Sequence, residues 1–131
     1  SMQAALLRNG PIVIVFNNVN ATNTRGKPTS AARKPLSVAL SVDGGKTWPW
    51  VRDVETGASG NDAEYHLPEK AGHDEYSYPS IKQGPEGNLH MAYTFRRTTI
   101  KYVTFSEQWI RDGGTTGQFK GDPQSAASKK N

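Results

Sequence analysis

The chain has 131 residues, the length of one ordinary domain, and only 34% of them are hydrophobic. It contains no cysteine, which excludes a disulfide framework, a thiolate metal site and a cysteine nucleophile. No apolar run approaches the ~20 residues of a membrane span. The net charge of +4 is scattered over loop-like stretches and forms no basic stripe, so we expect neither a nucleic-acid partner nor a membrane partner.

Short apolar or alternating runs bounded by Gly, Asn and Pro predict a succession of β-strands. Asn9-Gly10 is a strong signal for a tight hairpin between the first two of them. The expected strands cover residues 4–8, 11–17, 35–42, 48–54, 76–83, 89–96 and 99–105. We expect long polar loops over residues 19–35 and 56–75 and a single helical turn at "SEQWI". The Gly- and Ser-rich residues 111–131 are expected to form a flexible tail.

The stretch "SVDGGKTW", residues 41–48, predicts a turn with its own small core between two strands. Its pattern is Ser-x-Asp-x-Gly-x-x-Trp, with Ser41, Asp43, Gly45 and Trp48 at the pattern positions. Asp43 can accept hydrogen bonds from the backbone amides that follow it, and glycine tolerates a positive φ. Trp48 is expected to fold back as an apolar plug beneath the turn. The role of these four residues is therefore expected to be structural.

The order of the expected strands is that of two antiparallel meanders, one of four strands and one of three. "LLRNGPIVIVFNN" and "IKQGPEGNLHMAYTF" repeat one scheme, in which an apolar strand, a Gly-bearing turn and a second apolar strand follow each other. A repeat of four-strand units is typical of a β-propeller, which is built from such blades. The fold class is therefore expected to be all-β.

The same stretches resemble a known family. Residues 41–48 are similar to the Asp-box, or BNR repeat, of sialidases and other propellers. "EYSYPSIKQGPEGNLHMAYTFRRTTIKYVTF" resembles the final part of sialidase-like proteins. The resemblance covers about residues 4–110 and implies the C-terminal two-blade portion of a six-bladed, sialidase-type propeller. The first blade would span about residues 4–55, the second about 75–106, and together they would form one segment over residues 1–110.

This resemblance also implies site residues. Sialidases use a tyrosine nucleophile at the start of a late blade, and Tyr78 in "Tyr78-Pro79-Ser80-Ile81" falls at that place, although Pro79 replaces the usual Ser. Tyr76 competes two residues earlier and, by strand alternation, on the same face. Both tyrosines could instead simply line the propeller channel. Arg96 and Arg97 could bind an anionic sugar, because a planar guanidinium pairs with a carboxylate.

Glu75 is a further candidate catalytic carboxylate, since it directly precedes the tyrosines in "HDE". His73, Asp74 and Glu75 are adjacent and cannot all converge on one ion, so neither a metal nor another cofactor is expected. His90 alternates with the apolar residues of its strand and is expected to point away from the core.

The family's remaining clamp arginines and its acid/base Asp come from earlier blades. The expected function is thus that of a fragment or short relative of a sialidase-like glycoside hydrolase. Its partner would be a terminal sugar such as sialic acid, and the chain would be incomplete as a catalyst alone. The alternative is a non-enzymatic β module for self-association or glycan binding. An uncovered strand edge at residues 99–105 also predicts a homo-oligomer, or completion by the remainder of a parent propeller.

Overall fold

A computed structural model describes residues 1–18, 33–56 and 75–113. The elements are β1 (Met2–Leu6), β2 (Ile12–Asn17), β3 (Leu36–Ser41), β4 (Trp50–Glu55), β5 (Tyr76–Gln83), β6 (Leu89–Phe95), β7 (Thr99–Phe105) and α1 (Glu107–Asp112). The seven strands agree with the predicted ones in order, and no bound differs by more than two residues. Most of the two predicted long loops and of the predicted tail lies outside the described residues.

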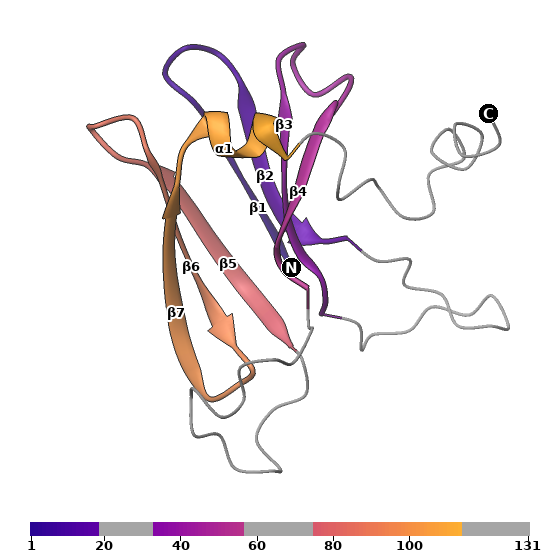
Figure 1. Ribbon diagram of the computed structural model, residues 1–131, viewed down its shortest axis with the longest axis vertical. Helices are drawn as coiled ribbons and strands as arrows, with labels where there is room; N and C mark the ends of the chain where they lie inside the picture. Colours follow the sequence, from indigo (N-terminus) through magenta and orange to yellow (C-terminus); the bar gives the residue numbers. More distant parts are fainter. Residues whose placement is uncertain (19–32, 57–74, 114–131) are drawn as a thin grey trace, which may run out of the picture.

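The strands form two antiparallel sheets that face each other (Figure 1). The first sheet has the order β1-β2-β3-β4 and the second the order β5-β6-β7. Neighbours in sequence are neighbours in each sheet, so both sheets are meanders of the kind that form propeller blades. The predicted all-β fold class is confirmed. β5 lies against β1 and β2, which brings the two sheets together along their first strands.

One hydrophobic core fills the space between the sheets, because alternate residues of each strand point into it. β3 is buried along its whole length, and β6 alternates between buried and half-buried residues. The buried core residues are Leu7, Val13, Val15, Leu36, Val38, Leu40, Tyr76, Ile81, Leu89, Met91, Tyr93, Phe95 and Ile110. This core holds both sheets in place and so positions the ends of their strands.

The helix α1 ties the chain after β7 back to the first sheet. Ser106 caps it by accepting a hydrogen bond from the Trp109 amide at 3.0 Å, and Ile110 is fully buried. The guanidinium of Arg52 on β4 lies 3.8 Å from the Trp109 ring centroid and donates to the Trp109 carbonyl at 2.6 Å. The helix continues to Asp112, two residues into the stretch 111–131 that the sequence assigns to the tail. Within the described residues, no helix is long and apolar enough to cross a membrane.

Candidate functional site

The connections between successive strands alternate between two ends of the molecule, and they do so in the same way in both sheets. The turn end carries the β1–β2, β3–β4 and β5–β6 turns and lies uppermost in Figure 1. At the opposite end, the site end, β2, β4 and β6 finish and β3 and β5 begin. The Asp-box stretch 41–48 lies at the turn end, whereas Glu75, Tyr76, Arg96 and Arg97 all lie at the site end.

The Asp-box turn is closed by hydrogen bonds between residues at most four positions apart. The Ser41 hydroxyl donates to Asp43 Oδ1 at 2.8 Å and accepts from the Gly45 amide at 2.9 Å. Asp43 Oδ1 also accepts from the Thr47 amide at 2.8 Å. Trp48 folds back so that its indole N–H donates to the Gly45 carbonyl at 3.1 Å, with the ring against Gly45. Trp48 remains only half-buried, so it covers the turn without joining the main core.

The charge of Asp43 is part of this turn. Hydrogen bonds from the Thr47 side chain and backbone, with a further one from Ser41, lower the pKa of Asp43 from 3.8 to about 2. The carboxylate therefore stays ionised to well below neutral pH, and its hydrogen bonds hold the turn. Nothing in this arrangement faces the site end, which agrees with a structural role.

A β-bulge separates the two tyrosines of the site end. Ser77 pairs with Thr94 and Ser80 with Ala92, so β5 has one residue more than β6 in this interval. Tyr78 lies in the bulge with φ +51°, a left-handed conformation that side chains rarely adopt. Side chains point alternately to the two faces of a strand, so one extra residue breaks the alternation between the residues on its two sides.

Tyr76 and Tyr78 consequently point in different directions. Tyr76 is 2% exposed and packs in the core against Tyr93 and Phe95, with ring centroids 6.4 and 5.6 Å away. Tyr78 is 69% exposed. The expectation that both lie on one face was wrong, and the extra residue in β5 is the reason. A buried Tyr76 has no access to a substrate in this structure.

Arg33, which precedes β3, lies beside Tyr78. Its guanidinium carbon is 5.4 Å from the centroid of the Tyr78 ring, within the range of a cation–π contact. The Arg33 carbonyl accepts from the Tyr76 amide at 3.0 Å, which fixes this segment against β5. Sequence reasoning missed Arg33 because it lies in a polar stretch 45 residues away along the chain from Tyr78. Its only sequence signal is a basic residue just before a predicted strand.

Glu75 and Arg97 also meet at this end, whereas Arg96 turns inward. Both arginines occupy the β6–β7 turn with positive φ, +52° at Arg96 and +57° at Arg97. The Arg96 amide donates to the Glu75 carbonyl at 2.7 Å, and the Arg97 guanidinium Nε lies 3.9 Å from a Glu75 carboxylate oxygen. Arg96 is 6% exposed, so of the two predicted substrate-binding arginines only Arg97 reaches the surface.

The described part of the site lacks the partners that a tyrosine nucleophile needs. Within residues 1–18, 33–56 and 75–113, no carboxylate or histidine is hydrogen-bonded to the Tyr78 hydroxyl. Among the same residues no three His, Cys, Asp or Glu side chains gather as a metal site would require. His73 and Asp74 of the "HDE" stretch lie outside the described residues. Tyr78 with Arg33, and Glu75 with Arg97, thus lie at the site end without a complete catalytic pair among the described residues.

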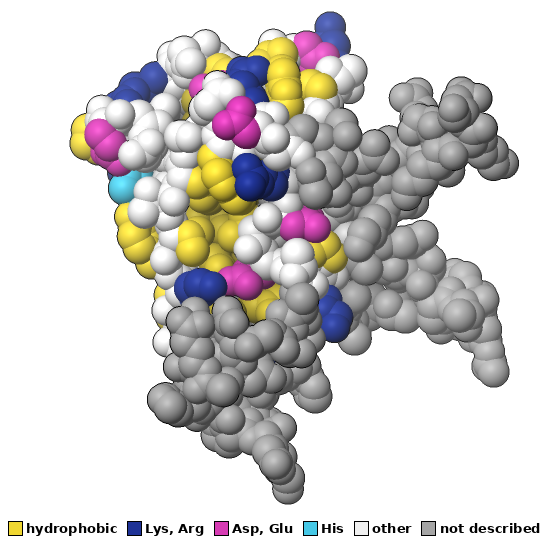
Figure 2. Space-filling view, viewed as in Figure 1, with side chains coloured by type: hydrophobic (Ala, Val, Ile, Leu, Met, Phe, Trp, Pro, Cys, Tyr) yellow, Lys and Arg dark blue, Asp and Glu magenta, His cyan; other side chains and the backbone are white. Residues whose placement is uncertain are grey.

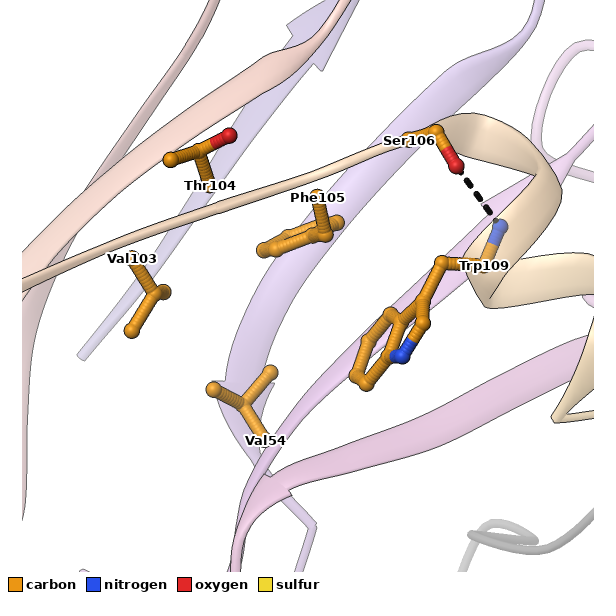
Figure 3. A pocket seen from close by; sticks show the side chains of 6 residues that line it. All are labelled: Val54, Val103, Thr104, Phe105, Ser106 and Trp109. Carbon is orange, nitrogen blue, oxygen red and sulfur yellow. Dashed lines mark hydrogen bonds between the residues drawn. The ribbon is translucent and has the colours of Figure 1, made fainter.

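A second feature lies along the open side of the two sheets. A cavity of about 380 Å³ is lined by Val54, Val103, Thr104, Phe105, Ser106 and Trp109 (Figure 3). Figure 2 shows hydrophobic side chains gathered on this face with charged side chains around them. Lys101 on β7 pairs with Glu55 on β4 at 2.7 Å, two residues before the cavity-lining Val103. The cavity thus adjoins β7, whose outer edge has no neighbouring strand in the described part of the second sheet.

Comparison with known proteins gives one family. A family model described as a BNR repeat-like domain matches residues 1–91, which include the whole first sheet, all of β5 and the start of β6. No curated protein matches the chain.

Proposed function

The chain belongs to the family of BNR repeat-like domains, and we propose that it binds a terminal acidic sugar at its site end without hydrolysing it alone. The observation that carries this proposal is the exposed Tyr78 ring on a left-handed bulge, with the Arg33 guanidinium 5.4 Å from its centroid. Non-glycine residues with positive φ cost free energy, and such strain concentrates at ligand sites. Tyr78, Arg96 and Arg97 all have positive φ at this one end.

The chemistry of these side chains suits an acidic sugar. The face of a tyrosine ring packs against the C–H groups of a sugar, and a guanidinium forms paired hydrogen bonds with a carboxylate. Arg33 supplies a cation beside Tyr78 and Arg97 a second one beside Glu75, whose carboxylate can accept hydrogen bonds from sugar hydroxyls. A neutral sugar could pack against the tyrosine ring but would offer no carboxylate to pair with the guanidinium groups. We therefore propose a carboxylated sugar of the sialic acid type.

Hydrolysis is proposed only for a larger assembly. Tyr78 lacks a base among the described residues, and the two other predicted contributors, Tyr76 and Arg96, are buried. In the sialidase-like resemblance, two clamp arginines and the acid/base Asp come from earlier blades. We propose that such residues, on the remainder of a parent propeller, complete the catalyst.

Binding is tested by NMR titration of the isotope-labelled chain with sialyllactose and, separately, with lactose. We expect shifts at the site end with sialyllactose only, and we expect Arg33→Ala to weaken binding at least about tenfold because a charge-assisted pair is lost. Lys46→Ala is the matched control, since it removes one exposed positive charge at the turn end. Equal binding of both sugars, or no effect of Arg33→Ala, would contradict the proposal.

Catalysis is tested with a fluorogenic sialoside. We expect no turnover by the isolated chain above the rate of buffer. Turnover that disappears in Tyr78→Phe would show that the chain is an enzyme in its own right.

We also propose that the free edge of β7 pairs with a strand of a second copy, or of a parent propeller. This is supported by the difference between a four-stranded and a three-stranded sheet and by the apolar cavity beside β7. A strand added there would cover Val103 and Phe105, which are only half-buried. Light scattering at micromolar concentration should give a multiple of the monomer mass, and Val103→Lys should restore the monomer. A monomeric wild-type chain with a well-dispersed NMR spectrum would contradict self-association.

A further inference from the structure

Three polar side chains form a relay on the outer face of the second sheet, the face that points away from the core. His90 on β6 lies between Tyr102 on β7 and Glu86 in the β5–β6 turn. Its Nδ1 is hydrogen-bonded to the Tyr102 hydroxyl, and its Nε2 is hydrogen-bonded to the Glu86 carboxylate. The His90 and Tyr102 rings are stacked, with centroids 5.9 Å apart and planes at 27°.

The order of these groups is that of a nucleophile, a base and a residue that orients the base. In neutral His90, Nε2–H donates to Glu86, which leaves Nδ1 to accept from the Tyr102 hydroxyl. A hydroxyl held against an oriented base is the usual arrangement of an activated nucleophile. If Tyr102 gives up its proton, the resulting imidazolium lies next to the Glu86 carboxylate, which stabilises it.

The surroundings keep this relay in place. Hydrogen bonding to its own backbone amide, with a contribution from His90, lowers the pKa of Glu86, so its carboxylate stays ionised near neutral pH. Arg8 donates to the Gly84 and Pro85 carbonyls at 2.9 and 3.2 Å and adds a favourable charge interaction with Glu86.

The backbone of the β5–β6 turn lies close to the relay at Gly84. A Cβ at Gly84 would lie 2.5 Å from His90 Nε2 and 2.5 Å from a Glu86 oxygen, so any other residue there would push these two side chains aside. The neighbours of His90 across the sheet are Lys82 on β5 and Thr104 on β7. Lys82 is thus the cation that pairs across the sheet with His90, and Arg8 is the cation that acts on Glu86.

We propose that Tyr102 is a nucleophilic tyrosine that accepts acyl groups from activated acyl compounds. The Tyr102 oxygen attacks the acyl carbon, the bond from that carbon to its leaving group breaks, and the Tyr102 proton passes to His90 Nδ1. His90 then returns this proton to the leaving group, and the product is an aryl ester on Tyr102. This inference is independent of the proposed sugar site, which lies at the other end of the strands.

The chain contains its own control. Tyr78 is 69% exposed and Tyr102 is 58% exposed, so accessibility alone favours reaction at Tyr78. Tyr78 has no histidine or carboxylate on its hydroxyl among the described residues. Faster reaction at Tyr102 would therefore measure the contribution of the relay.

The experiment is limited acetylation of the full chain with N-acetylimidazole, followed by peptide mass spectrometry. We expect Tyr102 to be acetylated at least about tenfold faster than Tyr78, because general-base assistance accelerates proton removal. His90→Phe keeps an aromatic ring against Tyr102, and it should reduce the Tyr102 rate to that of Tyr78 while leaving Tyr78 unchanged.

Glu86→Gln should give an intermediate Tyr102 rate, because it retains a hydrogen-bond acceptor without the negative charge. The Tyr76 rate in each variant reports on whether the fold is intact, since Tyr76 is 2% exposed and unfolding would expose it to the reagent. A Tyr102 rate equal to or below that of Tyr78 in the wild-type chain would overturn the proposal. A ratio unchanged in His90→Phe would overturn it as well.

Discussion

The turn end is held by contacts between residues close in sequence, and the site end by contacts between residues distant in sequence. At the turn end, the hydrogen bonds of the Asp-box join residues no more than four positions apart, and positive φ falls on glycines. At the site end, segments around Tyr78 that are distant in sequence meet, and positive φ falls on Tyr78, Arg96 and Arg97. Local hydrogen bonding makes the turn end a stable connection, whereas the site end holds strained residues, of which Tyr78 and Arg97 are exposed and Arg96 is buried. Backbone strain of this kind clusters at functional sites, which is why the binding proposal is made for the site end.

The largest expected effect separates the two tyrosines of the site end. Tyr76→Ala should lower the free energy of unfolding by on the order of 3–5 kcal/mol, because it leaves a cavity beside Tyr93 and Phe95. Tyr78→Ala should change it by less than about 0.5 kcal/mol, since the ring is mostly exposed. Urea unfolding of both variants measures the difference. Equal losses would mean that the bulge does not separate the two side chains.

At the turn end, Trp48→Ala should cost about 1–2 kcal/mol, less than the value for a fully buried tryptophan. The indole is half-buried and loses its hydrogen bond to Gly45 together with its packing on the turn. Urea unfolding again gives the value, with Lys46→Ala as a control on the same turn. A loss as large as that of Tyr76→Ala would place Trp48 in the main core.

The pH dependence of the turn follows from Asp43. Its pKa is about 2 in the folded chain and 3.8 without the fold, so the ionised form is favoured by folding. The stabilisation is complete above about pH 4 and is lost as the pH falls towards 2. The Tm of the wild-type chain should therefore exceed that of Asp43→Asn near neutral pH, and the gap should close between pH 4 and pH 2. A gap that is constant over this range would exclude the carboxylate as its cause.

The smallest effect tests the strain at the site end. Arg97→Gly should raise the free energy of unfolding by about 0.5–1 kcal/mol, because glycine adopts φ +57° without a clash. The lost contact with Glu75 is long and exposed, so it offsets little of this gain. Lys82→Gly, at an exposed strand position, should instead lower stability. Destabilisation by both changes would show that Arg97 is not strained.

Much of the fold could be predicted from sequence, and the site much less. The seven strands and the hydrogen bonds of Asp43 follow from alternation and turn chemistry, which act over a few residues. The prediction that Tyr76 and Tyr78 share a face was wrong, because the alternation of residue types in the sequence does not reveal the extra residue in β5. Arg33 was missed because its position depends on how the segment before β3 packs against β5. The length of α1 depends on the contact of Trp109 with Arg52 of β4 and on the burial of Ile110 in the core.

By itself, the sequence determined the all-β class, the order of the strands, the Asp-box turn and the family, because each of these rests on short patterns and local hydrogen bonds. Only the tertiary structure decided which tyrosine is buried, which arginine reaches the surface and which groups contact His90. Those outcomes depend on the register between strands and on the packing of one sheet against the other, and a single inserted residue changes them. Side chains close in sequence can thus face opposite environments, and the site is formed where distant segments meet.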